Sequence, residues 1–233
     1  MSSHFNTTCW TVILDSAKSD PAESRPALES LCQTYWEPLY SYARRSGQSH
    51  ENAQDITQSF FKHLLEKNLP GHADPGLGRF RSYLLSSLRH FMVDYHRSSK
   101  SLKRGGQVEH VPFKAEFLPS LPSNGETPEA AYDRKWAHTL ITLCLDRIQA
   151  EQATIGQSER FSLMRPLLLD PGDRSPAAGE LTSRFGMTPG SIRTAISRLR
   201  ARFREIVRQE VSRLVADASE IDDEIAYLFR AMQ

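Results

Sequence analysis

The sequence predicts an all-α protein with two helical domains joined by a flexible linker. Apolar residues recur every three or four positions along most of the chain, and alternating strand patterns hardly appear. Between residues 100 and 126 this period is lost, and glycine and proline accumulate. A chain of 233 residues with 39% hydrophobic content can bury one large core or two small ones.

The first domain is expected to span residues 1–99 and to hold four helices. Thr8 can cap a short helix that continues through Leu14. A second helix is expected over about 24–45 and a third after Ser49, with Gly47 between them, and a fourth over about 79–99. The apolar positions that should form the core are Leu28, Leu31, Tyr35, Leu39, Tyr42, Ala53, Ile56, Phe60, Leu64, Phe80, Leu84, Leu88, Phe91 and Tyr95.

The second domain is expected to follow the linker of residues 100–126 and to span residues 127–216. Thr127 and Pro128 form a helix start signal, and a shorter helix is expected over 159–169. A short helix over 179–185, the turn residue Gly186 and a long helix that starts at Pro189, with Thr188 as its expected cap, then form a helix-turn-helix. The apolar stripe of the long helix contains Ile192, Ile196, Leu199, Phe203, Val207, Val211 and Leu214.

Positive charge is concentrated in two blocks, although the net charge of the chain is only +1. Residues 79–104 carry seven Lys or Arg against the single acid Asp94, and residues 184–213 carry eight Arg against Glu205 and Glu210. Two separate basic blocks indicate two contacts with a polyanion such as DNA. In the helix-turn-helix, early residues of the long helix should reach base edges, while Arg200, Arg202, Arg204 and Arg208 contact phosphates or solvent. The base-reading set is Ser191, Arg193, Thr194, Ser197 and Arg198.

Residues 217–233 form an acidic tail with five carboxylates, and its apolar residues have helical spacing. Two interpretations remain open at this stage. The tail either packs as an amphipathic helix on its own domain, or folds back onto the arginine-rich helix and competes with DNA.

No feature of the sequence indicates an enzyme, a metal site or a cofactor. Cys9, Cys32 and Cys144 lie far apart, and the histidines do not have metal-ligand spacing. No nucleophile, base and orienting group occur in a catalytic pattern, and no phosphate-binding loop is present. The sequence also has no signal peptide and no long apolar run, so a cytoplasmic protein without a membrane segment is expected.

The stretch ENAQDITQSFFKHLLEKN, the stretch GRFRSYLLSSLRHFMVDYHRSSKSLKRGG and the C-terminal helix-turn-helix occur in an order that resembles bacterial RNA polymerase sigma factors of the extracytoplasmic-function (ECF) group. In this resemblance Asp55, Gln58 and Phe61, with Lys62 beside them, match the segment of sigma region 2 that docks on the β′ clamp of the polymerase core. Ser59 stands where an acid is usual.

The fourth helix resembles the sigma segment that recognises and melts the promoter −10 element. Tyr83, Arg89, His90 and Arg97 are the expected contacts, with Tyr83 in place of the usual Trp and His90 in place of the usual Asn. An aromatic and basic helix suits this task because it can stack unpaired bases and neutralise the strand.

The helix-turn-helix resembles sigma region 4, which reads the −35 element, so Arg200 and the base-reading set are expected to bind DNA there. The resemblance implies RNA polymerase core and promoter DNA as partners and allows an anti-sigma regulator. Two alternatives remain: a stand-alone helix-turn-helix regulator, and a sigma-like adaptor that binds core without efficient promoter melting.

Overall fold

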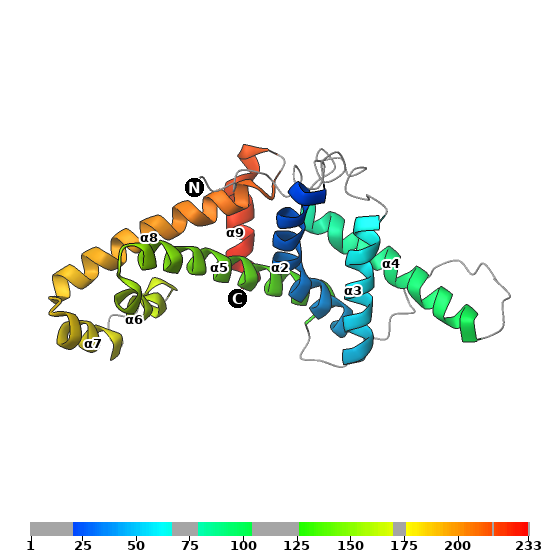
Figure 1. Ribbon diagram of the computed structural model, residues 1–233, viewed down its shortest axis with the longest axis horizontal. Helices are drawn as coiled ribbons and strands as arrows, with labels where there is room; N and C mark the ends of the chain where they lie inside the picture. The colour runs from blue at the N-terminus through cyan, green and yellow to red at the C-terminus, as the bar shows by residue number, and fades with distance from the viewer. Residues whose placement is uncertain (1–20, 67–78, 104–125, 170–175, 216, 233) are drawn as a thin grey trace. The chain divides into compact units, whose positions relative to one another are not determined.

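The computed structural model describes residues 21–66, 79–103, 126–169, 176–215 and 217–232 (Figure 1). All regular secondary structure in these ranges is helical, which confirms the all-α prediction for the described part of the chain. The expected helix at residues 8–14 and most of the expected linker lie outside these ranges. The chain divides into two compact units, one formed by residues 1–139 with 212–233 and the other by residues 140–211.

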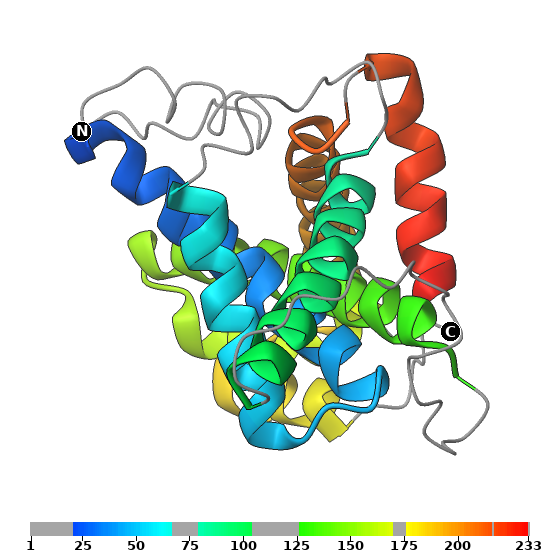
Figure 2. The same cartoon turned by 90° about the vertical axis from the view of Figure 1, so that its right-hand side faces the viewer.

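Three helices form the core of the first unit: α2 (Pro21–Arg45), α3 (His50–Glu66) and α4 (Phe80–Lys103). Helix α3 packs against both α2 and α4, as Figure 2 shows. Gly47 joins α2 to α3 with a φ of 90°, a conformation that glycine adopts without strain. The backbone N–H of Asn52 donates to Ser49 Oγ (3.1 Å), so the predicted cap of α3 is confirmed.

The buried face of α4 differs from the prediction toward the end of the helix. Phe80, Leu84 and Leu88 are buried as expected. The next buried residue is Met92, whereas Phe91 and Tyr95 are half-buried. A spacing of four residues carries the buried face from Leu88 to Met92, and the aromatic rings lie at its edge.

The first unit also contains the start of α5 (Pro128–Thr154) and the C-terminal elements η4 (Ala218–Glu220) and α9 (Ile221–Ala231). Tyr132, Trp136 and Leu228 are fully buried there. These boundaries differ from the expected ones, which assigned residues 127–139 to the second domain and treated 217–233 as a separate segment. Buried ion pairs, described below, hold these elements to α4.

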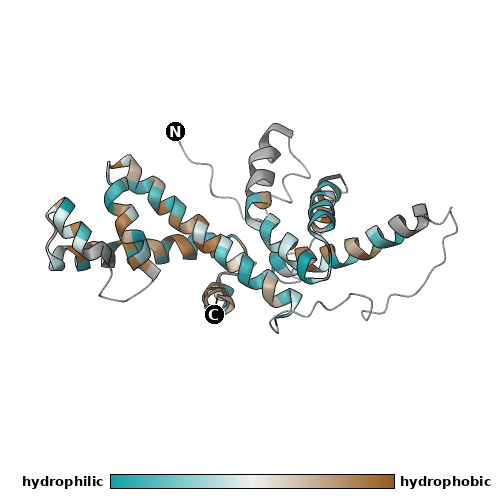
Figure 3. Cartoon of the chain, turned by 90° about the horizontal axis from the view of Figure 1, so that it is seen from below, coloured by the Kyte–Doolittle hydropathy of each residue, from teal (hydrophilic) through white to brown (hydrophobic). Residues whose placement is uncertain are grey.

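The second unit contains the rest of α5 together with α6 (Ser158–Leu169), α7 (Pro176–Phe185) and α8 (Pro189–Ser212). The predicted turn and cap are both present: Gly186 has a φ of 63°, and Ser191 N–H donates to Thr188 Oγ1 (3.1 Å). Apolar and polar residues are interleaved along these helices (Figure 3). One core cluster joins α6, α7 and α8, and its buried members are Met164, Leu167, Leu181 and Ile192.

Candidate polymerase and nucleic-acid interfaces

Helix α3 presents a polar face to solvent. Asp55, Gln58 and Lys62 are exposed, and their spacing of three and four residues places them on one side of the helix. Phe61 does not share this face. Its side chain is 5% exposed and stacks on Trp36, with ring centroids 5.7 Å apart. Phe61 therefore anchors α3 to α2, and the expectation that it offers a docking surface does not fit its burial.

The exposed side of α4 brings together three of the four residues expected to meet the −10 element. Arg89, His90 and Arg97 are exposed, and Arg97 pairs with Asp94 at 3.8 Å. Tyr83 is half-buried and lies beside Phe80, with ring centroids 6.3 Å apart. The helix thus shows solvent a row of basic and imidazole groups with one aromatic ring at its edge.

Arg89 is held by two partners within the first unit. Its Nε donates to the Tyr42 hydroxyl oxygen (2.9 Å), and its Nη2 donates to the carboxylate of Glu129 in the first turn of α5. Burial alone would lower the pKa of Arg89, but the hydrogen bond to Tyr42 and the charge of Glu129 raise the pKa above its ordinary value. Arg89 thus has one partner in α2, the Tyr42 hydroxyl, and one in α5, the exposed Glu129 carboxylate.

Arg81, which is not among the residues expected from the sequence, is the most buried arginine among the described residues of the first unit, with 7% of its surface exposed. Arg81 Nε donates to Glu224 Oε1 and Nη1 to Asp133 Oδ1, both at 2.7 Å. Burial lowers the pKa of Arg81, but hydrogen bonding and charge from Glu224, with the charge of Asp133, raise the pKa well above its ordinary value. The sequence could have indicated this pairing, because Arg81 lies three residues before the buried Leu84 and an arginine within an apolar stripe needs an acidic partner.

The acidic tail forms the amphipathic helix α9, which packs in the first unit rather than in the second. Glu224 of α9 is 1% exposed and pairs with Arg79 (2.9 Å) as well as Arg81, both at the start of α4. The Tyr227 ring also lies 4.1 Å from the guanidinium carbon of Arg81. Of the five tail acids that could fold back onto the arginine-rich helix, Glu224 pairs with arginines at the start of α4 instead.

The first half of α8 exposes the five residues expected to read bases. Ser191, Thr194 and Ser197 are exposed between Arg193 and Arg198, which are exposed as well. Within the part of the chain that the structure describes, Arg193 and Arg198 form no ion pair. This end of α8 follows the glycine turn of the helix-turn-helix, so small polar side chains and exposed arginines lie together in the first turns of the long helix.

Arg200 and Arg202 have structural partners instead. Arg200 Nη2 donates to the backbone carbonyl of Leu167 (2.7 Å) and Nε to that of Leu168 (3.3 Å). These are carbonyls of the last turn of α6, which have no partners within the helix, and a guanidinium satisfies them. Arg200, expected to contact DNA, therefore ties α8 to the end of α6.

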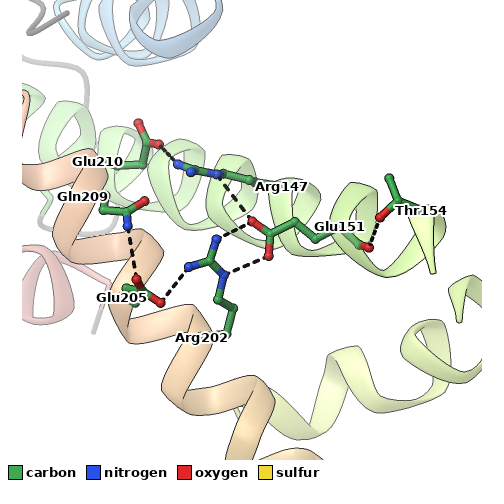
Figure 4. Close-up of polar contacts among 7 residues, drawn as sticks. All are labelled: Arg147, Glu151, Thr154, Arg202, Glu205, Gln209 and Glu210. Carbon is green, nitrogen blue, oxygen red and sulfur yellow. Dashed lines mark hydrogen bonds and ion pairs between the residues drawn. The ribbon is translucent and has the colours of Figure 1, made fainter. Parts of the chain in front are cut away.

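Arg202 belongs to a network of ion pairs that joins α8 to α5 (Figure 4). It binds both carboxylate oxygens of Glu151, at 2.6 and 2.9 Å, and also pairs with Glu205 at 2.6 Å. The hydrogen bond from Arg202 lowers the pKa of Glu151, although burial opposes the shift. Arg147 extends the network by pairing with Glu210 (2.8 Å). Charged side chains in the second half of α8 therefore form ion pairs that hold this helix against α5.

The described residues contain no cluster of three or more His, Cys, Asp or Glu that could hold a metal ion. None of the described helices combines the length and apolar character that crossing a membrane requires.

Comparison with known proteins identifies one part of the chain. Residues 31–101 match the family model of sigma-70 region 2, and this range runs from within α2 to within α4. No curated protein and no solved structure matches the chain. The exposed faces of α3 and α4 thus lie inside the matched segment. Residues 31–101 carry a sigma-70 region 2 domain, and this match supports a factor of the sigma-70 family.

Proposed function

We propose that this chain is an ECF-type sigma factor, which binds RNA polymerase core and directs it to promoters. The match of residues 31–101 to sigma-70 region 2 carries the proposal. Region 2 suggests polymerase binding and transcription initiation, and the sigma-70 family is not a family of enzymes. A stand-alone helix-turn-helix regulator would have no use for such a domain.

In this proposal the polar face of α3, formed by Asp55, Gln58 and Lys62, docks on the β′ clamp. The exposed side of α4 meets the −10 element, with Arg89, His90 and Arg97 toward the strand and Tyr83 at its edge. A positively charged helix with an aromatic ring suits single-stranded DNA because stacking and charge neutralisation both contribute.

The α7 and α8 pair would read the −35 element through the exposed residues of the first half of α8. Ser191, Thr194 and Ser197 are small enough to let the helix approach base edges, and Arg193 and Arg198 can reach bases or phosphates. Arg200 would act indirectly, because its bonds to the last turn of α6 hold α8 against α6.

The test is co-elution of the purified protein with RNA polymerase core. A double variant, Asp55→Ala with Gln58→Ala, should lose co-elution, because both side chains lie on the exposed face of α3. The matched control is Asp146→Ala with Gln149→Ala, which removes the same two groups at the same spacing from exposed positions of α5. Phe61 is left intact because its loss would disturb the core.

Absence of co-elution by the parent protein would refute the sigma-factor proposal. Co-elution by the parent and by both double variants would refute the α3 docking face alone. A holoenzyme that forms but does not open promoters would favour the adaptor alternative over the proposed initiation factor.

A further inference from the structure

Three carboxylates lie at the start of α5 and just before it, and each pairs with an arginine of α2 or α4. Glu126 precedes the helix, and Glu129 and Asp133 lie in the first two turns of α5, four residues apart on one helical face. Their partners are respectively Arg45 at the end of α2 (3.2 Å), Arg89 in the middle of α4, and Arg81 near its start (2.7 Å). These three carboxylates are called the acidic stripe below.

Asp133 is the least exposed member of the acidic stripe, at 17%, and its partner Arg81 is 8% exposed. Asp133 and Glu224 together enclose Arg81, whose guanidinium carbon also lies 5.1 Å from the Trp136 ring centroid. Both Tyr132 and Trp136 of α5 are fully buried in the same unit. The pair of Asp133 with the buried Arg81 holds the first two turns of α5 against α4, where Glu129 lies one turn before Asp133 and meets Arg89.

Arg89 differs from Arg81 in its exposure. The Arg89 side chain is 46% exposed and that of Glu129 is 43% exposed, whereas Arg81 is 8% exposed. An exposed pair of this kind is weak, and a phosphate can replace a carboxylate as the partner of a guanidinium at little cost. Arg81 therefore holds the stripe in place, and Arg89 is the cation that a nucleic acid can capture.

We propose that the acidic stripe is an internal competitor for nucleic acid, in which Glu129 occupies Arg89 until a DNA strand displaces the carboxylate. The inference rests on the proposed function, because it assumes that α4 contacts promoter DNA. The competition weakens DNA binding by the free protein, and the anchor at Arg81 keeps the competitor ready to rebind. The stripe thus acts as an autoinhibitory contact within the region 2 unit.

The test is binding of a fluorescent oligo(dT) strand to the full-length protein, measured by anisotropy at low salt. Glu129→Gln should bind about 1.4- to five-fold more tightly than the parent, since an exposed ion pair contributes about 0.2–1 kcal/mol. The matched control is Asp223→Asn, which removes the same charge from an exposed position on α9 of the same unit. The control should bind like the parent. Circular dichroism checks that each variant is folded.

A second comparison assigns the gain to Arg89. In an Arg89→Ala background, Glu129→Gln should no longer tighten binding, because the cation that it would release is absent. An equal gain in that background would overturn the proposal, and so would an unchanged affinity in Glu129→Gln or undetectable binding by all variants.

Co-elution with polymerase core, measured on the same proteins without DNA, separates this inference from the proposed function. Loss of the Glu129→Gln effect with co-elution intact removes only the acidic stripe as competitor. A clear Glu129→Gln effect without any co-elution leaves the competitor in place but removes the sigma-factor assignment.

Discussion

The two basic helices, α4 and α8, place their available positive charge at opposite ends. In α4 the early arginine Arg81 is buried between two acids, and exposure increases along the helix through Arg89 to Arg97. In α8 the early arginines Arg193 and Arg198 are exposed, and the later Arg202 binds Glu151. A count of charge along the sequence treats both helices alike. Acidic side chains from other helices pair with some of these arginines and so determine which arginines remain exposed.

The difference predicts that loss of the Arg81 partner has the largest effect on stability. Glu224→Gln leaves the guanidinium of Arg81 buried with Asp133 as its remaining carboxylate. Removal of one partner from a buried ion pair costs about 3 kcal/mol or more, because the other charge remains poorly solvated. Urea unfolding followed by tryptophan fluorescence measures this, since Trp136 lies against Arg81.

The matched control for that variant is Asp223→Asn, which changes the neighbouring exposed acid. It should alter the free energy of unfolding by no more than about 0.5 kcal/mol. If Glu224→Gln were no more destabilising than this control, the ion pair between Glu224 and Arg81 would not hold α9 to α4.

A second prediction compares two arginines of the same helix. If the first half of α8 binds DNA as proposed, Arg193→Ala should weaken binding to a short random-sequence duplex by about 1 kcal/mol, roughly five-fold, because an exposed cation of that face is lost. Arg202→Ala should leave this affinity nearly unchanged, because Arg202 is bound to Glu151 and Glu205. Anisotropy titrations of both variants at one salt concentration provide the comparison. Equal losses would show that the network in Figure 4 opens when DNA binds.

Local signals in the sequence were sufficient for most of the helical framework. Ser49, Thr127 and Thr188 were expected to cap helices, and each accepts a backbone N–H. Gly186 was expected at a left-handed turn and has a φ of 63°. Such signals depend on residues within one turn of each other, so the chain alone is enough to read them.

The partners of charged side chains could not be read in the same way. Arg81 and Glu224 are 143 positions apart, and no local pattern connects them. The helical wheel placed Arg200 on the face expected to bind DNA. Its side chain is long enough to reach the last turn of α6, where it donates to the carbonyl of Leu167. The two compact units have other boundaries than the expected domains for the same reason, since the ion pairs of Asp133 and Glu224 join the start of α5 and the tail to the first unit.

The smallest predicted effect concerns Glu151, the α5 partner of Arg202. Its pKa is lowered from the ordinary value of 4.5 by the hydrogen bond from Arg202, so the folded state favours the ionised carboxylate. A carboxyl group with a depressed folded pKa stabilises the protein above its unfolded pKa, and this stabilisation is lost as the pH falls through the folded pKa. Glu151→Gln should therefore destabilise the second unit by at most about 1 kcal/mol at pH 7, and the difference should shrink below about pH 4.5.

Urea unfolding followed by far-UV circular dichroism can measure this effect, because Trp10, Trp36 and Trp136 all lie outside residues 140–211. The part of the transition that tryptophan fluorescence does not detect reports the second unit. Glu159→Gln is the control, because Glu159 is 77% exposed and pairs with Arg184 at 3.4 Å. A deficit for Glu151→Gln that stayed constant at acid pH would mean that its charge does not hold α8 to α5. If the difference in the free energy of unfolding disappears at acid pH, the charge of Glu151 holds α8 to α5 through Arg202. Arg202 is then a packing residue, and the proposed DNA contacts lie in the first half of α8.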